Sequence, residues 1–78
     1  MAFKTIDDLK VGDYILKYKH RDRWILSRAI VMSIHFNYTD NFVSQVDVLN
    51  IGLAPGRARA CFFRNEQNEF DVVNVRDI

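Results

Sequence analysis

The feature that most constrains this chain is its longest apolar stretch, which runs from Trp24 to Phe36. The stretch is rich in β-branched residues, which favour a strand over a helix. Strict alternation of apolar and polar residues breaks at Ser27, Arg28 and Ser33. Because an extra residue bends a strand, we predict a long strand with a bulge or bend at these positions.

Shorter segments on either side of this stretch also have strand patterns. Together with residues 24–36, the predicted strands cover residues 14–19, 42–51, 57 or 58 to 64, and 70–73. Turn-forming residues separate them at positions 37–41, 52–56 and 65–68. Thr5 precedes Asp8 by three residues, as an N-cap does, so we predict one short helical turn over residues 5–9. Residues 75–78 are expected to add a closing turn or short strand.

Composition limits the class of protein. The chain has 78 residues, of which 49% are hydrophobic and 13% aromatic, and its net charge is only +1. These values exclude intrinsic disorder and predict one small globular domain, complete in itself. Cys61 is the only cysteine, so neither an intrachain disulfide nor a zinc module is predicted, and a reducing cytoplasm is the expected location. The sequence also lacks the apolar run of a signal peptide or membrane span.

Five short strands with almost no helix predict an all-β fold, a small five-stranded antiparallel barrel with a short N-terminal helical turn. The chain resembles the SH3-like small barrels of the Tudor and KOW kind. The resemblance covers roughly residues 9–78. It depends on short motifs at residues 11–13, 24, 29–34, 46–50 and 73–78.

The resemblance to Tudor domains implies a place where an aromatic cage would bind a methylated cation. Tyr18 stands at the first ring position of such a cage. Ser27, Leu49 and Ile51 stand where further rings would be needed. The cage is therefore incomplete, and the resemblance does not imply recognition of methylated residues.

The nearly neutral net charge conceals two basic segments. Residues 17–28 contain five basic residues against Asp22 alone, and residues 57–64 contain three basic residues and no acidic one. Aromatic and histidine side chains lie among the first group. We therefore predict a basic binding surface formed by Lys17, Tyr18, Lys19, Arg21, Arg23, Arg57, Arg59 and Arg64.

Two kinds of partner fit that surface. The cations would neutralise phosphates while Tyr18 stacks on a base of RNA or single-stranded DNA. Alternatively, the same surface and an exposed Phe62 or Phe63 would dock on an acidic groove of a larger protein, as a small stand-alone regulator or inhibitor does. No acid–base pair, phosphate loop or metal-ligand cluster is evident in the sequence. We therefore expect a non-enzymatic module without a cofactor, and the oligomeric state is left open.

Several single residues also carry expectations. Trp24 is predicted to be a core residue, and Cys61 a buried thiol between apolar neighbours. Phe62 and Phe63 are adjacent in a predicted strand, so one should be buried and the other exposed. Phe36 and Phe42 flank the turn at residues 37–41 and are expected to pair across it.

Overall fold

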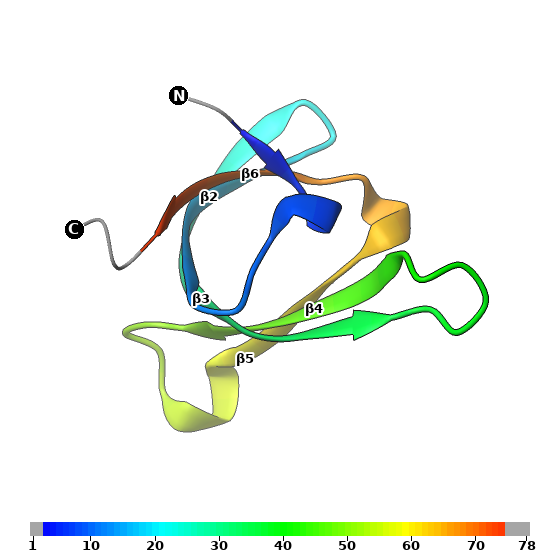
Figure 1. Ribbon diagram of the computed structural model, residues 1–78. Coiled ribbons are helices and arrows are strands. Elements are labelled where there is room, and N and C mark those ends of the chain that lie inside the picture. The colour runs from blue at the N-terminus through cyan, green and yellow to red at the C-terminus, as the bar shows by residue number, and fades with distance from the viewer. Residues whose placement is uncertain (1–2, 75–78) are drawn as a thin grey trace.

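The computed structural model describes residues 3–74 of the chain (Figure 1), and the closing turn predicted for residues 75–78 lies outside these. The described part consists of short strands and 3₁₀ turns. In chain order the elements are β1 (Lys4–Thr5), η1 (Ile6–Asp8), β2 (Asp13–His20), β3 (Arg23–Phe36), β4 (Val43–Asn50), η2 (Pro55–Arg57), β5 (Arg59–Phe63), η3 (Arg64–Glu66) and β6 (Glu69–Asn74). The predicted all-β class and all five predicted strand regions are confirmed, with residues 70–73 lying within β6.

All six strands belong to one antiparallel sheet, in the order β1-β6-β2-β3-β4-β5. The predicted five-stranded barrel is therefore wrong in two respects. A sixth strand, β1, pairs with β6, and it was missed because two residues are too few to show a strand pattern. The sheet is also not closed, because its edge strands β1 and β5 share no ladder within residues 3–74.

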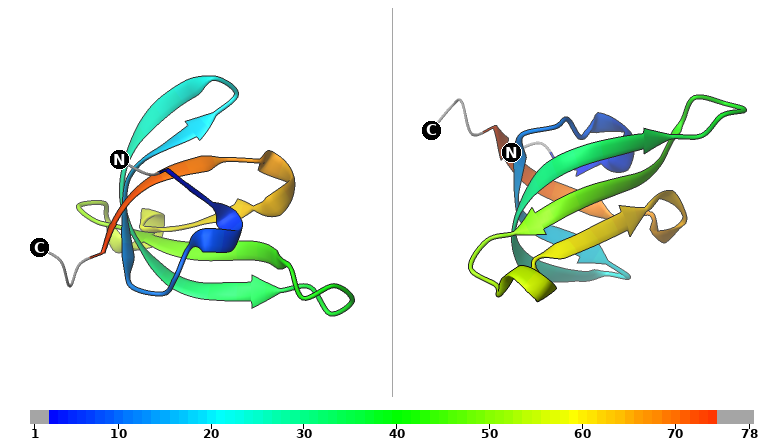
Figure 2. Two further views of the ribbon diagram at one scale, coloured as in Figure 1. Left: turned by 45° about the horizontal axis from the view of Figure 1, so that its top comes forward. Right: turned by 90° about the horizontal axis from the view of Figure 1, so that it is seen from below.

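The predicted bend in β3 is confirmed. Ser27 and Arg28 together lie opposite the single residue Leu16 of β2, which is the two-against-one arrangement of a β-bulge. A second irregularity follows at Met32, because Val31 and Ser33, on either side of it, pair with two consecutive residues of β4. Both views in Figure 2 show β3 curving from its hairpin with β2 to its pairing with β4. The bulges thus let one long strand serve both parts of the curled sheet.

A bulge in β2 changes which of its side chains face the core. Leu16 is an extra residue relative to β6. Ile15, just before the bulge, is fully buried, whereas Tyr18, after it, packs against the core. Strict alternation from Tyr14 would place Tyr18 on the same face as Tyr14, but the bulge puts it on the face of Ile15, because the alternation restarts after Leu16.

The core lies inside the curled sheet and draws on its central strands. The largest fully buried side chains are Ile15, Val31, Val46 and Phe70, one each from β2, β3, β4 and β6. The edge strand β5 joins them through Phe62, whose ring centroid lies 5.0 Å from that of Phe70. Edge-to-face ring packing of this kind adds to the burial of apolar area. Side chains thus connect β5 to the strands that its backbone does not reach.

The N-terminal turn is confirmed as the 3₁₀ helix η1. The backbone N–H and the hydroxyl of Thr5 both donate to Oδ2 of Asp8, at 3.3 and 3.1 Å. Ile6 and Leu9 at the two ends of this turn are buried and fix it against the sheet. No helix within residues 3–74 is long and apolar enough to cross a membrane.

The adjacent phenylalanines of β5 behave as predicted. Phe62 is 7% exposed and belongs to the core, whereas Phe63 is 45% exposed. Other expectations about single residues are wrong. Cys61 is exposed because it precedes the buried Phe62 and therefore points to the opposite, outer face of β5. Phe36 lies opposite Val43 rather than Phe42, which precedes β4.

Candidate functional site

The hairpin of β2 and β3 holds the first basic segment. Its two turn residues, Arg21 and Asp22, have φ of 50° and 64°, the left-handed conformation that a two-residue hairpin turn requires. His20 and Arg23 pair directly before and after this turn. Both arginines are exposed at the tip of the hairpin. The sequence therefore places two cations at a tight, well-defined turn.

One face of the hairpin combines cations with large apolar side chains. Lys19 lies opposite Trp24, and Lys17 lies opposite Leu26, so these four side chains share a face. The Lys17 ammonium lies 5.1 Å from the centroid of the Trp24 ring, within cation–π distance. Leu26 is 87% exposed. We refer to Lys17, Trp24 and Leu26 on this face, together with Arg21 and Arg23 at the tip, as the hairpin surface. Arg23 pairs with His20, so its side chain starts from the opposite face of the hairpin.

Trp24 lies on this outer face, so its predicted place in the core is wrong. The side chain is 37% exposed, and its ring centroid lies 4.8 Å from that of Phe3, which precedes β1. The bulge at Ser27 and Arg28 separates Trp24 from the buried positions of β3 and leaves its part of the strand beyond the core. The ring therefore packs the N-terminal segment against the hairpin instead of filling the interior.

The opposite face of the hairpin turns toward the core. The Tyr18 ring lies 4.8 Å from the Phe62 ring in an edge-to-face arrangement, so it is half-buried and not a free stacking platform. Nδ1 of His20 lies 3.2 Å from Oδ1 of Asn68. Nδ2 of this asparagine is buried without a partner among residues 3–74. These contacts tie the inner face of the hairpin, as far as the residue before its turn, to β5 and to the turn before β6.

The structure brings only part of the predicted basic surface together. Lys17, Lys19, Arg21 and Arg23 share the hairpin, although Nζ of Lys19 lies 3.9 Å from a carboxylate oxygen of Glu69. The residues of the second basic segment lie elsewhere. In Figure 1, η2 with Arg57 and the start of β5 with Arg59 lie at the end of the molecule away from the hairpin tip.

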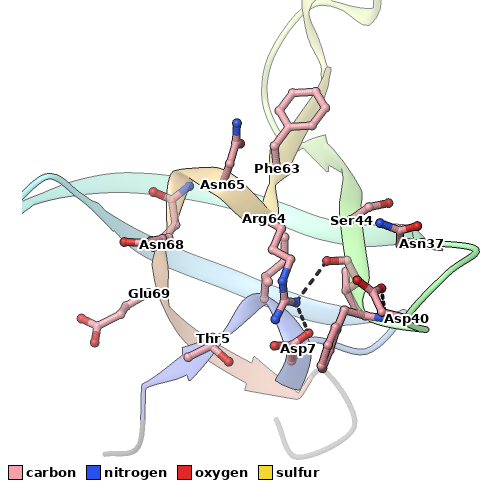
Figure 3. Close-up of a pocket in the computed structure, with 14 residues that line it drawn as sticks. Thr5, Asp7, Asn37, Asp40, Ser44, Phe63, Arg64, Asn65, Asn68 and Glu69 are labelled. Carbon is pink, nitrogen blue, oxygen red and sulfur yellow. Dashed lines mark hydrogen bonds and ion pairs between the residues drawn. The ribbon is translucent and has the colours of Figure 1, made fainter.

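Arg64 occupies a third place, a polar cleft between η1, η3 and the turn that joins β3 to β4. Figure 3 shows its guanidinium pointing at Asp7, with which it forms an ion pair, and at the carbonyl oxygen of Val43, to which it donates at 3.2 Å. The same group lies 4.6 Å from the centroid of the Phe42 ring. The hydrogen bond from Arg64 lowers the pKa of Asp7 and raises the pKa of the arginine itself. Arg64 thus joins three segments of the chain.

A polar network on the outer face of β3 and β4 was not predicted. Oδ2 of Asp47 accepts hydrogen bonds from the Ser33 hydroxyl at 2.8 Å and from Nε2 of His35 at 2.6 Å, and Oδ1 accepts from Gln45 at 2.7 Å. These bonds, that from His35 above all, lower the pKa of Asp47 to about 2. The pairing of His35 with Gln45 and of Ser33 with Asp47 in the ladder brings the four side chains together. Only the register of β3 against β4 shows that these four residues meet, so the sequence alone could not predict the network.

Trp24 and Leu26 are the two residues of the hairpin surface that the predicted basic surface did not include. Leu26 lies within the longest apolar stretch of the chain, and the polar residues Ser27 and Arg28 that follow it are the only sequence signal for the change of face. Comparisons with protein-family models, curated proteins and solved structures found no match for the chain. Within residues 3–74 there is also no group of three or more His, Cys, Asp or Glu side chains placed to hold a metal ion.

Proposed function

We propose that this chain is a non-enzymatic binding module that docks its hairpin surface on an acidic protein surface. The observation that carries the proposal is the exposure of Leu26 beside Trp24, with Lys17 on the same face and two arginines at the tip. Large apolar side chains rimmed by charges are typical of protein–protein interfaces. Leu26 would enter an apolar hollow of the partner while the cations meet its carboxylates.

Nucleic acid is the weaker of the two kinds of partner. Binding to single strands combines phosphate-neutralising cations with free rings for base stacking. The Tyr18 ring packs on Phe62, and Lys19 lies near Glu69. Arg64 is engaged with Asp7, and the other two arginines of its segment lie away from the hairpin tip. These arrangements leave few groups that would follow one phosphate backbone.

We further propose that the sheet is an open relative of the SH3-like barrels of the Tudor and KOW kind. The order of pairing supports this, because β2 to β5 are sequential neighbours and β6 returns to pair with β2. A 3₁₀ turn, η3, precedes that last strand. Folds of this kind serve many unrelated functions, so the functional proposal depends on the hairpin surface and not on the fold.

The proposal is tested by photo-crosslinking in cells that naturally produce the protein. A photoreactive phenylalanine analogue replaces Leu26 in one variant and Leu53 in the control. Leu53 is also exposed but lies in the connection between β4 and β5. We expect a discrete protein adduct from position 26, identified by mass spectrometry, and none from position 53. Equal labelling at both positions would contradict the proposal.

Point variants then test the chemistry of the interface with the captured partner. Leu26→Ser and Arg21→Glu should each weaken binding by about tenfold or more, as losses at interface hot spots do. Leu53→Ser makes the same apolar-to-polar change in the connection between β4 and β5, and it should leave affinity unchanged.

Nucleic-acid binding is measured separately by fluorescence anisotropy with labelled single-stranded RNA, single-stranded DNA and duplex DNA at two salt concentrations. The proposal predicts no binding that weakens steeply with salt. If Lys17, Arg21 and Arg23 did neutralise phosphates of a single strand, the log–log salt slope would be about −2. Such a slope would move the function to nucleic acid.

A further inference from the structure

The outer edge of β5 presents backbone groups that pair with nothing else in the sheet. β5 is the last strand in the sheet order. The N–H of Asn50 donates to the carbonyl of Ala58, and the N–H of Phe63 donates instead to the Glu66 side chain at 2.8 Å. Because residues of an antiparallel strand alternate between bonding one neighbour and facing away, Arg59 and Cys61 turn their N–H and C=O groups outward, as Phe63 does.

Within residues 3–74, this edge has few of the devices that usually protect an edge strand. Natural sheets block their edges with bulges, prolines, charged side chains or very short strands, and of these β5 has the charge of Arg59 and a length of five residues. β5 pairs with β4 without any shift of register, and it contains neither proline nor lysine. Glu66 covers only the N–H of Phe63 at one end. The opposite edge of the sheet, β1, has only two residues. β5 is therefore the edge at which another strand can be added.

The edge also borders a hollow, because the sheet is not closed. The hollow has a volume of about 240 Å³, and we refer to it as the seam. Residues of β5 line one side of it, and residues of β2 and β3 line the other. The lining includes Tyr18, His20, Ser27, Ala60, Cys61 and Phe62. Asn50 and Glu66 also line the seam, so an added strand would find backbone partners along β5 and both apolar and polar contacts inside the seam.

The charges at this edge indicate what kind of segment would bind. Arg57 and Arg59 are exposed at the start of β5. Asp47 lies opposite Cys61, further along the strand, and would repel a carboxylate there. The complementary segment is acidic beside the two arginines, neutral beside Cys61 and apolar where it faces Ala60 and the seam.

We propose that β5 binds an extended segment of a partner protein by strand addition, with acidic residues of the segment beside Arg57 and Arg59 and apolar residues in the seam. Main-chain hydrogen bonds give affinity in this mode, and alternate side chains give specificity. An antiparallel segment of the sequence Val-Thr-Val-Glu-Glu meets these conditions, with its threonine opposite Cys61 and its first glutamate opposite Arg59.

The probe is that pentapeptide, acetylated and amidated, and binding is followed by ¹⁵N–¹H NMR of the whole chain. We expect shifts concentrated on the amides of Arg59 and Cys61 and on residues that line the seam. The same peptide with an N-methyl group on its threonine should bind about tenfold more weakly or worse, because one main-chain hydrogen bond is lost and its acceptor is left unpaired. A peptide ending in two lysines should also lose binding.

Variants of the protein test the edge from the other side. Cys61→Pro removes one outward N–H and leaves the ladder with β4 intact, a change that edge strands tolerate. Cys61→Ala keeps the N–H and is the matched control. We expect the proline variant to lose binding and the alanine variant to retain it. The N-methyl peptide tests the same hydrogen bonds in the unaltered protein, whether or not the proline variant folds.

Three results would overturn the proposal. They are an absence of shifts at β5 with the unmodified peptide, equal binding of the N-methyl peptide, and concentration-dependent pairing of β5 with a second copy of the chain when no peptide is present. The proposal does not rest on the hairpin surface. Leu26→Ser should leave peptide binding unchanged, so the two proposals fail independently.

Discussion

Replacing Phe62 by alanine should remove a large share of the folding free energy. The ring is 7% exposed and lies 4.8 Å from the Tyr18 ring and 5.0 Å from the Phe70 ring. Core Phe→Ala changes cost about 3–5 kcal/mol. We expect the upper half of that range, because each aromatic contact adds about 0.5–1.5 kcal/mol to simple burial. A chain of this length has a stability of about 4–12 kcal/mol, so the loss is at least a third of the total.

Urea denaturation followed by circular dichroism measures this loss. With an m-value of about 1–2 kcal/mol/M, the midpoint should fall by about 2–5 M, or the variant should be unfolded without urea. Phe63→Ala is the control, because the neighbouring ring points to the other face and is 45% exposed. Its cost should stay below about 1.5 kcal/mol. Equal costs for the two variants would refute the view that ring packing by Phe62 connects β5 to the rest of the core.

Three further predictions concern charge, backbone and surface packing. Because hydrogen bonds from His35 and others lower the pKa of Asp47 from 3.8 to about 2, the ionised carboxylate stabilises the fold fully above pH 4, and this contribution is lost as the pH falls toward 2. The melting temperature should therefore drop less between pH 5 and pH 2 in Asp47→Asn than in the unaltered chain, and equal drops would exclude this carboxylate as the cause. Gly12 has a φ of +95° in open space, so Gly12→Ala should cost about 1–2 kcal/mol in thermal melts, whereas Gly56→Ala should be close to neutral. Trp24→Ala should cost about 1–2 kcal/mol in the urea assay, below the range for a buried ring, because the side chain is 37% exposed; a loss of 4 kcal/mol or more would return it to the core.

The strands could be predicted because their signals are local. The β-branched residues and turn residues gave the four main strands close to their observed bounds, and the polar interruptions in β3 gave its bend. Closure of the sheet depends instead on which edges meet, and no local pattern records that. The bulge at Leu16 could not be predicted from a local pattern either, because it is defined only by the register of β2 against β6. A bulge that is not predicted reverses the expected face of every side chain after it in the strand.

The binding surface could be predicted only as far as its charges are consecutive in sequence. The hairpin cations lie together because a two-residue turn joins their strands. The pairing of Arg64 with Asp7 spans 57 residues, and Tyr18 meets Phe62 from another strand. Both contacts occupy groups that the sequence suggested for ligand binding. Charge and residue type identify candidates for a site, but only the tertiary contacts show which of them remain available.

Both proposed surfaces exist because the sheet is not closed: the outer edge of β5 is unpaired within residues 3–74, and the hairpin on the other side of the seam extends away from it. The hairpin extends beyond the core, with exposed apolar residues on both faces, Ile25 on the inner and Leu26 on the outer. A peptide strand added to β5 would fill the seam against Tyr18 and Ser27, at the base of the hairpin. Hydrogen exchange of the hairpin amides should therefore slow when the pentapeptide binds, because filling the seam makes local opening of the hairpin more costly. Amides of the turn between β3 and β4 do not border the seam and should be unaffected. If the peptide protects β5 but not the hairpin, the two surfaces bind independently, and a partner could occupy either one without changing the other.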